Sequence, residues 1–446
     1  MSKHLVCAHR RSDRHPSGLG LGICLRLIDD FLRTNCSYNS LNIIYTTRST
    51  KKGTDTLAVL QAHLQRHSSI NRERVTFQPE NVELTSLLSI RDLARKLVTS
   101  DLGGIDALIC NAGIGGWTGI DWFKAVPQIL ADWRNNTVWP AFKLGTVGAI
   151  TKPQLPNAAF SESEPPLGEL FCANLFGHYM LAHWLMPLLR VRSSKDPCKI
   201  IWVSSIEPQD YHLQESDLQG LRTDAPYEHS KRLTDLLSLT ANQVMTLPSV
   251  VSFTTATSIK ITAPSTRRDR SAPSMHVYHP GIVVTSVISL VWIVQYAYLL
   301  GIFIARWIGS PWSTVEPYTA AHGATWLALA TDEEISRAEQ NAHVPRSDSE
   351  VVARRGHVKW GTAVTVGGSS SVKATEVDKW GINGSGTSYA STWWAGSNGR
   401  GRKPGAVEAK AESVRDFIAQ GARVWEQMEK LREQWEKRTN EFERMK

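Results

Sequence analysis

The chain has 446 residues and a net charge of +8, with 42% hydrophobic and 21% charged residues. This globular composition excludes a disordered, collagenous or coiled-coil chain. The length is about three times the usual domain size of roughly 150 residues, so we expect one domain with large insertions or appendages. The mild positive charge suits an anionic cofactor or an anionic membrane surface as well as it suits nucleic acid.

The six cysteines are single and scattered, with no CxxC pair and no closely spaced Cys and His residues that would hold zinc. We therefore expect neither a disulfide framework nor a structural metal. Near the N-terminus the apolar run is too short for the core of a signal peptide, so the bulk of the chain is expected to face the cytosol.

Short apolar runs alternate with amphipathic stretches along the first half of the chain. The apolar runs predict strands buried on both faces, at residues 41–45, 105–110, 199–203 and 275–278. The stretches with helical spacing lie at residues 22–33, 84–99, 168–190 and 227–245. Strands that alternate with helices predict an α/β fold, a doubly wound parallel sheet of the Rossmann type.

Three stretches interrupt this alternation. Residues 115–166 contain several Trp, Pro and Gly and predict a long insertion, and residues 252–274 are rich in Thr and Ser and predict a solvated loop. Residues 282–304 contain no charged side chain and match the ~20 residues that cross a hydrocarbon core. We expect this apolar segment, about residues 282–305, to lie on or span a membrane; a buried core helix is the alternative.

The last hundred residues differ in composition from the main domain, which we place at residues 1–345. Residues 346–406 form a Gly/Ser-rich tract that we expect to be weakly ordered. Residues 407–446 predict one amphipathic helix that packs on the body, with a partner helix or a membrane as the second choice. Its apolar side chains recur at helical spacing: Val414, Ile418, Trp425, Met428, Trp435 and Phe442.

A glycine-rich turn precedes the first predicted helix. Gly18, Leu19 and Gly20 lie where a helix N-terminus offers free N–H groups, and glycine lets a pyrophosphate approach the backbone. Arg48 follows the next predicted strand, where a carboxylate would select NAD and a cation accommodates a 2′-phosphate. The pattern therefore favours NADP.

Further along the chain, polar residues follow the predicted strands in a fixed order. Asn111 and Gly113 follow the strand at residues 105–110, and Asn174 lies on a predicted helix. Tyr227 and Lys231 lie four apart on one helix face, where the lysine can lower the phenol pKa and hold a ribose.

In this order the segments resemble the short-chain dehydrogenase/reductase family over about residues 5–330. More narrowly, four segments resemble the fungal 3-keto-steroid reductases of sterol C-4 demethylation: Ser-Gly-Leu-Gly-Leu-Gly-Ile, Tyr-Thr-Thr-Arg-Ser-Thr, Trp-Val-Ser-Ser-Ile-Glu-Pro and Pro-Tyr-Glu-His-Ser-Lys-Arg. The resemblance implies NADPH-dependent reduction of a 3-ketosteroid to the 3β-hydroxysteroid in ergosterol biosynthesis.

The resemblance also implies roles for individual residues. Tyr227 would be the general acid, and Lys231 would bind the nicotinamide ribose and tune the phenol. Ser205, with Ser204 as the alternative, would hydrogen-bond the carbonyl, and Asn174 would hold a proton-relay water. The implied cofactor-binding residues are Gly18, Leu19, Gly20, Arg48, Asn111, Gly113, Tyr227, Lys231, Pro280, Gly281 and Thr285.

The N-terminus departs from the family pattern. Arg14 stands where the family has its first glycine, and residues 5–8 are the candidate for a displaced first strand. Weakened cofactor binding is therefore one expectation, and a scaffold that keeps the fold without catalysis is one alternative function. Reduction of another hydrophobic carbonyl is a second alternative. Nucleic-acid binding ranks last because no basic helix supports it.

The resemblance places the enzyme on the endoplasmic reticulum membrane or a lipid droplet, with the catalytic domain facing the cytosol. Its implied partners are the C-4 sterol methyl oxidase, the C-3 sterol dehydrogenase/decarboxylase and oxidosqualene cyclase. The apolar segment would form the substrate lid, so a sterol ketone dissolved in the bilayer would enter from the membrane side.

Overall fold

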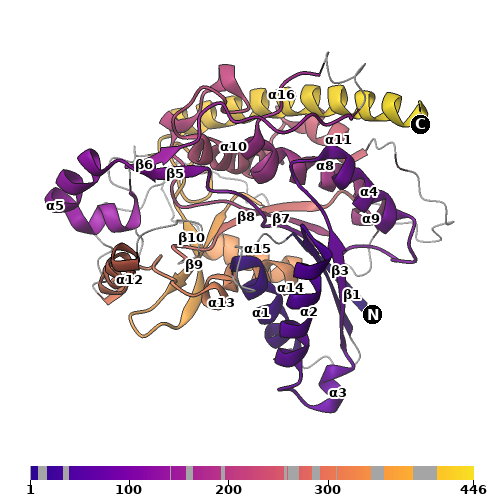
Figure 1. Cartoon of the computed structure of the whole chain (residues 1–446), viewed down its shortest axis with the longest axis horizontal. Helices are drawn as coiled ribbons and strands as arrows, with labels where there is room; N and C mark the ends of the chain where they lie inside the picture. The colour runs from indigo at the N-terminus through magenta and orange to yellow at the C-terminus, as the bar shows by residue number, and fades with distance from the viewer. Residues whose placement is uncertain are drawn as a thin grey trace.

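The computed structural model describes residues 2–8, 18–33, 40–140, 142–156, 164–191, 196–255, 259, 271–283, 292–307, 309–342, 356–384 and 409–445. Its centre is an eight-stranded sheet with helices on both faces (Figure 1), in the order β10-β9-β8-β7-β4-β1-β2-β3. All neighbours pair in parallel except the edge strand β10. The strands are β1 (Ser2–Ala8), β2 (Ser40–Thr47), β3 (Val75–Asn81), β4 (Ala107–Cys110), β7 (Lys199–Val203), β8 (Ser274–His279), β9 (Lys359–Val364) and β10 (Ser370–Thr375).

Two helical layers enclose two separate cores. One face of the sheet packs on α1 (Leu19–Arg33), α2 (Thr50–Leu64), α13 (Pro317–Ala320), α14 (His322–Leu329) and α15 (Asp332–Asn341). The other face packs on α4 (Leu87–Val98), α7 (Glu169–Phe171), the π-helical turn η1 (Cys172–Phe176), α8 (Gly177–Trp184), α9 (Met186–Leu189), α10 (Pro226–Thr240), α11 (Leu247–Thr255) and α16 (Ala411–Arg444). The doubly wound architecture is therefore confirmed.

The predicted strands are confirmed because their apolar runs are buried on both sides. Every residue of β4 and β7 is buried, as near-continuous apolar strands of parallel sheets require. Residues 5–8 belong to β1, which lies between β2 and β4 in the centre of the sheet. Arg14 falls outside the described residues.

The Gly/Ser-rich tract needs a correction. Its residues 356–384 are folded, since β9 and β10 extend the main sheet beyond β8. All six residues of β9 are buried. Trp360 belongs to the core that includes α1, and Trp380 belongs to the core that includes α16. The glycines and serines between the strands mark a tight turn, so composition alone concealed the strands. The rest of the tract lies outside the described residues.

The terminal helix α16 packs on the body, as predicted. Gly421 brings it against α10, because a Cβ there would lie 2.5 Å from the Thr240 Oγ1. The Trp425 indole donates a hydrogen bond to the Leu237 carbonyl at 3.1 Å, and Tyr179 on α8 donates to Glu429 at 2.7 Å. One helix thus supports both α8 and α10.

The insertion after β4 forms a small antiparallel pair and a helix: β5 (Trp117–Ile120), α5 (Trp122–Val138) and β6 (Lys143–Gly145). Helix α12 (Trp292–Trp307) contains the second half of the predicted apolar segment and packs on α5. Among the described helices, none combines the length and the apolarity needed to cross a bilayer. Short helical pieces complete the chain: α3 (Ser69–Arg72), η2 (Asp210–His212) and η3 (Glu215–Asp217).

Candidate active site

The candidate residues gather at the carboxyl ends of the parallel strands, where doubly wound sheets bind their ligands. Each follows its strand directly or begins the helix after it. Arg48 follows β2, Asn111 and Gly113 follow β4, Ser205 follows β7 and Gly281 follows β8. Thr285 lies outside the described residues.

The phenol, the serine and the lysine predicted for catalysis lie together. Pro226 starts α10, where its fixed φ suits the first helical position, and Tyr227 comes next. The Ser205 side chain lies close enough to the Tyr227 phenol to lower its pKa. The Lys231 ammonium lies 5.7 Å from the centre of the Tyr227 ring and donates to the Val203 carbonyl at 2.8 Å.

The neighbouring serine points elsewhere. Ser204 is buried, and its hydroxyl lies 3.5 Å from the Lys231 carbonyl oxygen. Of the two serines that the sequence left open, Ser205 is therefore the one whose side chain acts on the Tyr227 phenol.

The charges around the phenol keep it protonated. Burial raises the pKa of Tyr227, and the Glu207 carboxylate raises it further. Lys143 and Ser205 oppose this shift without cancelling it. The side chain can therefore donate a proton at neutral pH.

Lys231 has the opposite shift. Burial lowers its pKa to about 8, although the nearby Asp235 carboxylate favours the charged form. The ammonium is thus largely charged at neutral pH and loses its charge in mildly alkaline solution.

Asn174 joins the site from the π-helical turn η1, a backbone irregularity that is frequent at functional sites. Its side-chain amide accepts from the Ile114 N–H at 2.6 Å and donates to the Ile114 carbonyl at 2.9 Å. It also donates to Ser230 on α10 at 3.3 Å. A Cβ on Gly113 would lie 2.7 Å from the Asn174 Oδ1, so this approach requires glycine.

The residues predicted to bind the cofactor offer groups that suit the phosphates of NADP. Gly18 has φ +105° and leads directly into α1, whose first N–H groups have no partner within the helix. Arg48 is exposed and borders a cavity of about 90 Å³ that Gly113 also lines. A helix N-terminus, a cation and a glycine beside the backbone are the groups that an anionic dinucleotide would require here.

Trp312 and Thr314 hold the loop after β8 in place. Gly281 has φ +75°, and a Cβ there would lie 2.4 Å from the Trp312 carbonyl oxygen. The Thr314 hydroxyl donates to the Pro280 carbonyl at 2.9 Å. This packing fixes the Pro-Gly turn at the mouth of the sheet.

Sequence reasoning missed an ion cluster beside Tyr227. The Lys143 ammonium lies 2.6 Å from Glu207 and 3.0 Å from Glu228, and 4.4 Å from the centre of the Trp117 ring. That ring lies 5.0 Å from the Tyr227 ring. Burial lowers the pKa of Lys143, but Glu207 and Glu228 outweigh this and raise it well above its ordinary value.

A cavity of about 320 Å³ lies against this cluster and is lined by Trp117, Lys143, Glu207 and Glu228, among others. Glu207 and Glu228 stand within motifs quoted above, so their neighbourhood was open to prediction. Lys143 lies in the insertion, where no signal marked it.

A second missed residue is Lys359 of β9. Its ammonium is buried, forms an ion pair with Asp235 at 2.6 Å and donates to the Ser205 carbonyl at 2.6 Å. Asp235 lies one turn after Lys231 on α10. Lys359 therefore links the loop that contains Ser205 to α10, the helix that carries Tyr227 and Lys231.

The chain is similar to curated proteins along nearly its whole length. It is 42% identical to a 3-keto-steroid reductase of Aspergillus fumigatus over 96% of this chain and 94% of that protein. It is 34% identical to a 3-keto-steroid reductase of Gibberella zeae over 94% of this chain and 92% of that protein. The Saccharomyces cerevisiae 3-keto-steroid reductase is 25% identical over 82% of this chain and 88% of its own length.

No family model matches the chain. Among solved structures, salutaridine reductase from Papaver somniferum aligns with a TM-score of 0.41 at 16% identity, over 74% of this chain and 97% of that chain. L-sorbose reductase from Gluconobacter frateurii aligns with a TM-score of 0.40 at 15% identity, over 74% and 90%. The high identity and near-complete coverage of the Aspergillus and Gibberella proteins show that the chain belongs to the 3-keto-steroid reductase family.

Proposed function

We propose that this protein reduces a 3-ketosteroid to the 3β-hydroxysteroid with NADPH, in sterol C-4 demethylation. The observation that carries the proposal is the grouping of Ser205 and Lys231 around the Tyr227 phenol. Family membership supplies the substrate class, since the relatives are named for 3-keto-steroid reduction.

Tyr227 donates its proton to the C-3 carbonyl oxygen. Ser205 donates a hydrogen bond to the same oxygen, which orients the ketone and stabilises the charge that develops there. Lys231 holds the nicotinamide ribose, and its charge favours release of the phenolic proton. NADPH supplies the hydride to the carbonyl carbon, so one hydride and one proton convert the ketone into the alcohol.

The other predicted residues hold the cofactor. Gly18, Leu19 and Gly20 at the start of α1 receive the pyrophosphate, and Arg48 receives the 2′-phosphate. Asn111 and Gly113 form the wall beside β4, and Pro280 and Gly281 form the carboxamide side. Asn174 holds a proton-relay water that returns the proton to Tyr227.

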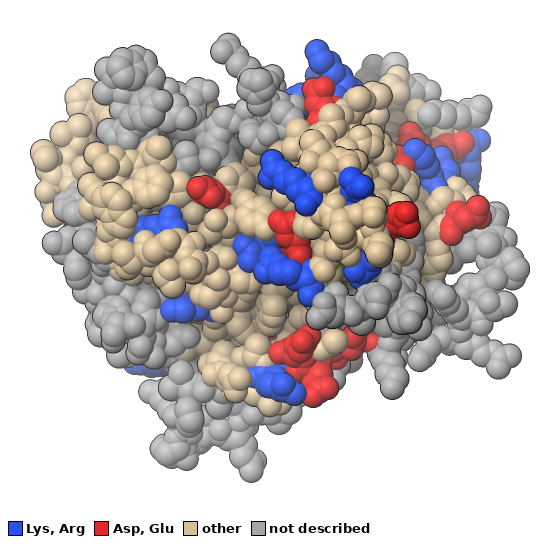
Figure 2. Space-filling view, turned by 90° about the horizontal axis from the view of Figure 1, so that it is seen from below, with Lys and Arg blue, Asp and Glu red and all other residues tan. Residues whose placement is uncertain are grey.

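A membrane surface is the proposed source of substrate. Helices α5 and α12 lie together at the left of Figure 1, and this side carries few charged side chains in Figure 2. Large apolar side chains are exposed there: Trp122, Phe123, Val126, Ile129, Leu130, Leu300 and Trp307. Exposed apolar patches of this kind occur where proteins meet membranes or partners.

We assign the enzyme to the endoplasmic reticulum membrane or a lipid droplet, with the C-4 sterol methyl oxidase, the C-3 sterol dehydrogenase/decarboxylase and oxidosqualene cyclase as partners. Vesicle co-sedimentation tests the membrane part. The double variant Phe123→Asp/Leu130→Asp should lose vesicle binding, whereas Ile70→Asp should keep it. Ile70 is 76% exposed on α3, away from α5. Equal binding by both variants contradicts the assignment.

NADPH oxidation with a 4-demethyl 3-ketosterol tests the reaction. The Tyr227→Phe variant removes the phenolic proton and should lower kcat by the ~10²–10⁴-fold typical of general acid catalysis. A Tyr227→Phe variant with the wild-type rate contradicts the mechanism.

Fluorescence titration with NADPH separates catalysis from a scaffold role. Saturable binding by the wild-type chain is the expected result. Its absence would favour a fold that has lost its cofactor. Turnover of a retinal or a fatty ketone in preference to the sterol would instead keep the mechanism and change the substrate.

A further inference from the structure

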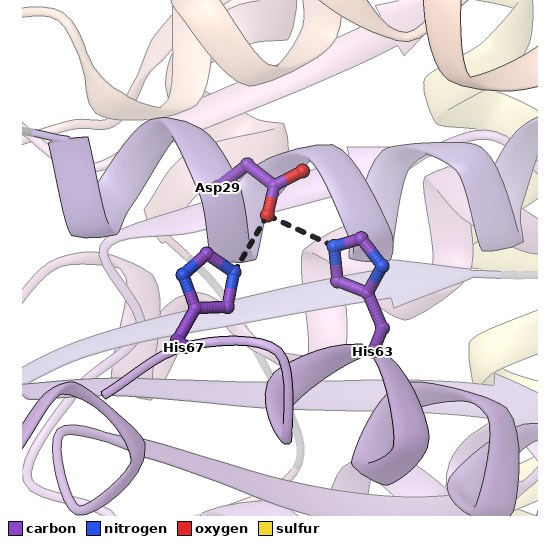
Figure 3. Close-up of side chains that lie close together, drawn as sticks. All are labelled: Asp29, His63 and His67. Atoms are coloured by element: carbon purple, nitrogen blue, oxygen red, sulfur yellow. Dashed lines mark hydrogen bonds and ion pairs between the residues drawn. The ribbon is translucent and has the colours of Figure 1, made fainter. Parts of the chain in front are cut away.

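Away from the active site, two histidines and an aspartate bring three metal-binding atoms together (Figure 3). Asp29 lies on α1, His63 lies in the last turn of α2, and His67 lies in the turn that follows. Their ligand atoms all lie within 4.8 Å of one another. In the part of the chain that the structure describes, no other three His, Cys, Asp or Glu side chains converge in this way.

The spacing of the three atoms suits a tetrahedral ion. The Nε2 atoms of His63 and His67 each lie 2.9 Å from the Asp29 Oδ1. Zinc bonds to imidazole nitrogen and carboxylate oxygen are about 2.0–2.2 Å long, so tetrahedral ligand atoms lie roughly 3.3 Å apart. For the two pairs that include Asp29, a shift of a few tenths of an ångström reaches this spacing.

The histidines already point their Nε2 atoms at the position that an ion would take. A carboxylate oxygen only accepts hydrogen bonds, so in the metal-free protein both rings donate to the Asp29 Oδ1. When an ion binds, each Nε2 presents its lone pair, and its proton moves to Nδ1 or to solvent. The same three side chains thus serve both states without changing their directions.

A neighbouring hydroxyl orients the carboxylate. The Tyr318 hydroxyl on α13 donates to the Asp29 Oδ2 at 2.6 Å, which leaves Oδ1 for the histidines. Hydrogen bonds of this kind to ligating carboxylates are typical of metal sites. The side chains of Asp29, His63 and His67 are 19%, 16% and 25% exposed, so an ion from solvent can reach them.

We propose that Asp29, His63 and His67 bind one zinc ion, with a water molecule in the fourth position. Its role is structural, because the ion joins α1, which begins at the glycine turn, to α2, which begins after Arg48. The sequence concealed the site, since the two histidines lie four apart while the aspartate comes from another helix. Two histidines supply only two ligands, so the sequence alone predicted no structural metal.

Zinc titration of the chelator-stripped full chain, in competition with a chromogenic chelator, tests the proposal. We expect one equivalent of zinc to bind in this competition. His63→Gln or His67→Gln should weaken zinc binding by roughly 100-fold, at least as much as the loss of an outer-shell partner does. Arg66→Gln is the matched control, because Arg66 lies between the histidines and is exposed. Zinc should raise the Tm of the wild type and the control but not of the histidine variants.

The proposal is overturned if the wild type binds no zinc, or if the histidine variants bind it as the wild type does, since the ion then lies elsewhere. Circular dichroism without metal checks that each variant is folded. Should a histidine variant fail to fold, Asp29→Asn and cobalt substitution replace it. Wild-type protein should give the intense absorption of tetrahedral Co²⁺, and Asp29→Asn should lose it; an unchanged spectrum also overturns the proposal.

Discussion

The ion pair between Lys359 and Asp235 is the most sharply testable contact that supports the active site. The two side chains are 3% and 0% exposed, and the Nζ–Oδ2 distance is 2.6 Å. Replacing Lys359 with Met fills the same space and leaves the buried Asp235 carboxylate without its direct ion-pair partner. Loss of one partner of a buried pair costs about 3–5 kcal/mol of unfolding free energy, a large share of the roughly 5–15 kcal/mol that stabilises a typical protein.

Urea unfolding followed by tryptophan fluorescence measures this loss. The control is Lys430→Met, because Lys430 pairs with Glu426 at the same 2.6 Å but is 71% exposed, and it should change little. The double variant Lys359→Met/Asp235→Leu should recover most of the stability, since it buries no unpaired charge. A loss below about 1 kcal/mol in Lys359→Met, or no recovery in the double variant, would refute the reasoning.

Three further predictions concern the reaction. Arg48→Ala should raise the KM for NADPH by roughly 10–100-fold, because a charge-assisted hydrogen bond contributes about 1.5–3 kcal/mol. The KM for NADH should stay unchanged, and equal effects on both cofactors would contradict the 2′-phosphate role. Burial lowers the pKa of Lys231 to about 8, so kcat/KM for NADPH should fall as the pH rises through that value. If kcat/KM stays constant up to about pH 10, near the ordinary lysine pKa, Lys231 is not the titrating group. Lys143→Met removes the cation that opposes the rise of the Tyr227 pKa caused by Glu207 and Glu228, so kcat should fall by up to about tenfold for each unit of that shift. Lys143→Arg should retain more activity, and a wild-type rate in Lys143→Met would remove the electrostatic role.

The sequence predicted those parts of the fold whose signal is local. The strand at residues 199–203 was placed with its true bounds, because four apolar residues in a row follow Lys199. Tyr227 and Lys231 were found through helical spacing, which is also a local property. The order of motifs along the chain then identified the fold.

Contacts between distant segments could not be predicted in this way. Lys143 stands in the insertion, and its carboxylate partners Glu207 and Glu228 come from beyond β7. Strand β9 has Gly361 and Thr362 in its middle, so it lacks the apolar run of a buried strand. Its burial depends on Asp235, which neutralises Lys359 only in the folded protein.

Helix α16 has a consequence for how the protein is made. It comes from the end of the described chain, yet Trp425 and Gly421 contact α10 and Glu429 contacts Tyr179 on α8. During synthesis, Tyr227 and Lys231 therefore leave the ribosome long before the helix that buttresses them. A message truncated before residue 411 should yield a protein whose sheet can form while its catalytic helix stays exposed to chaperones and proteases.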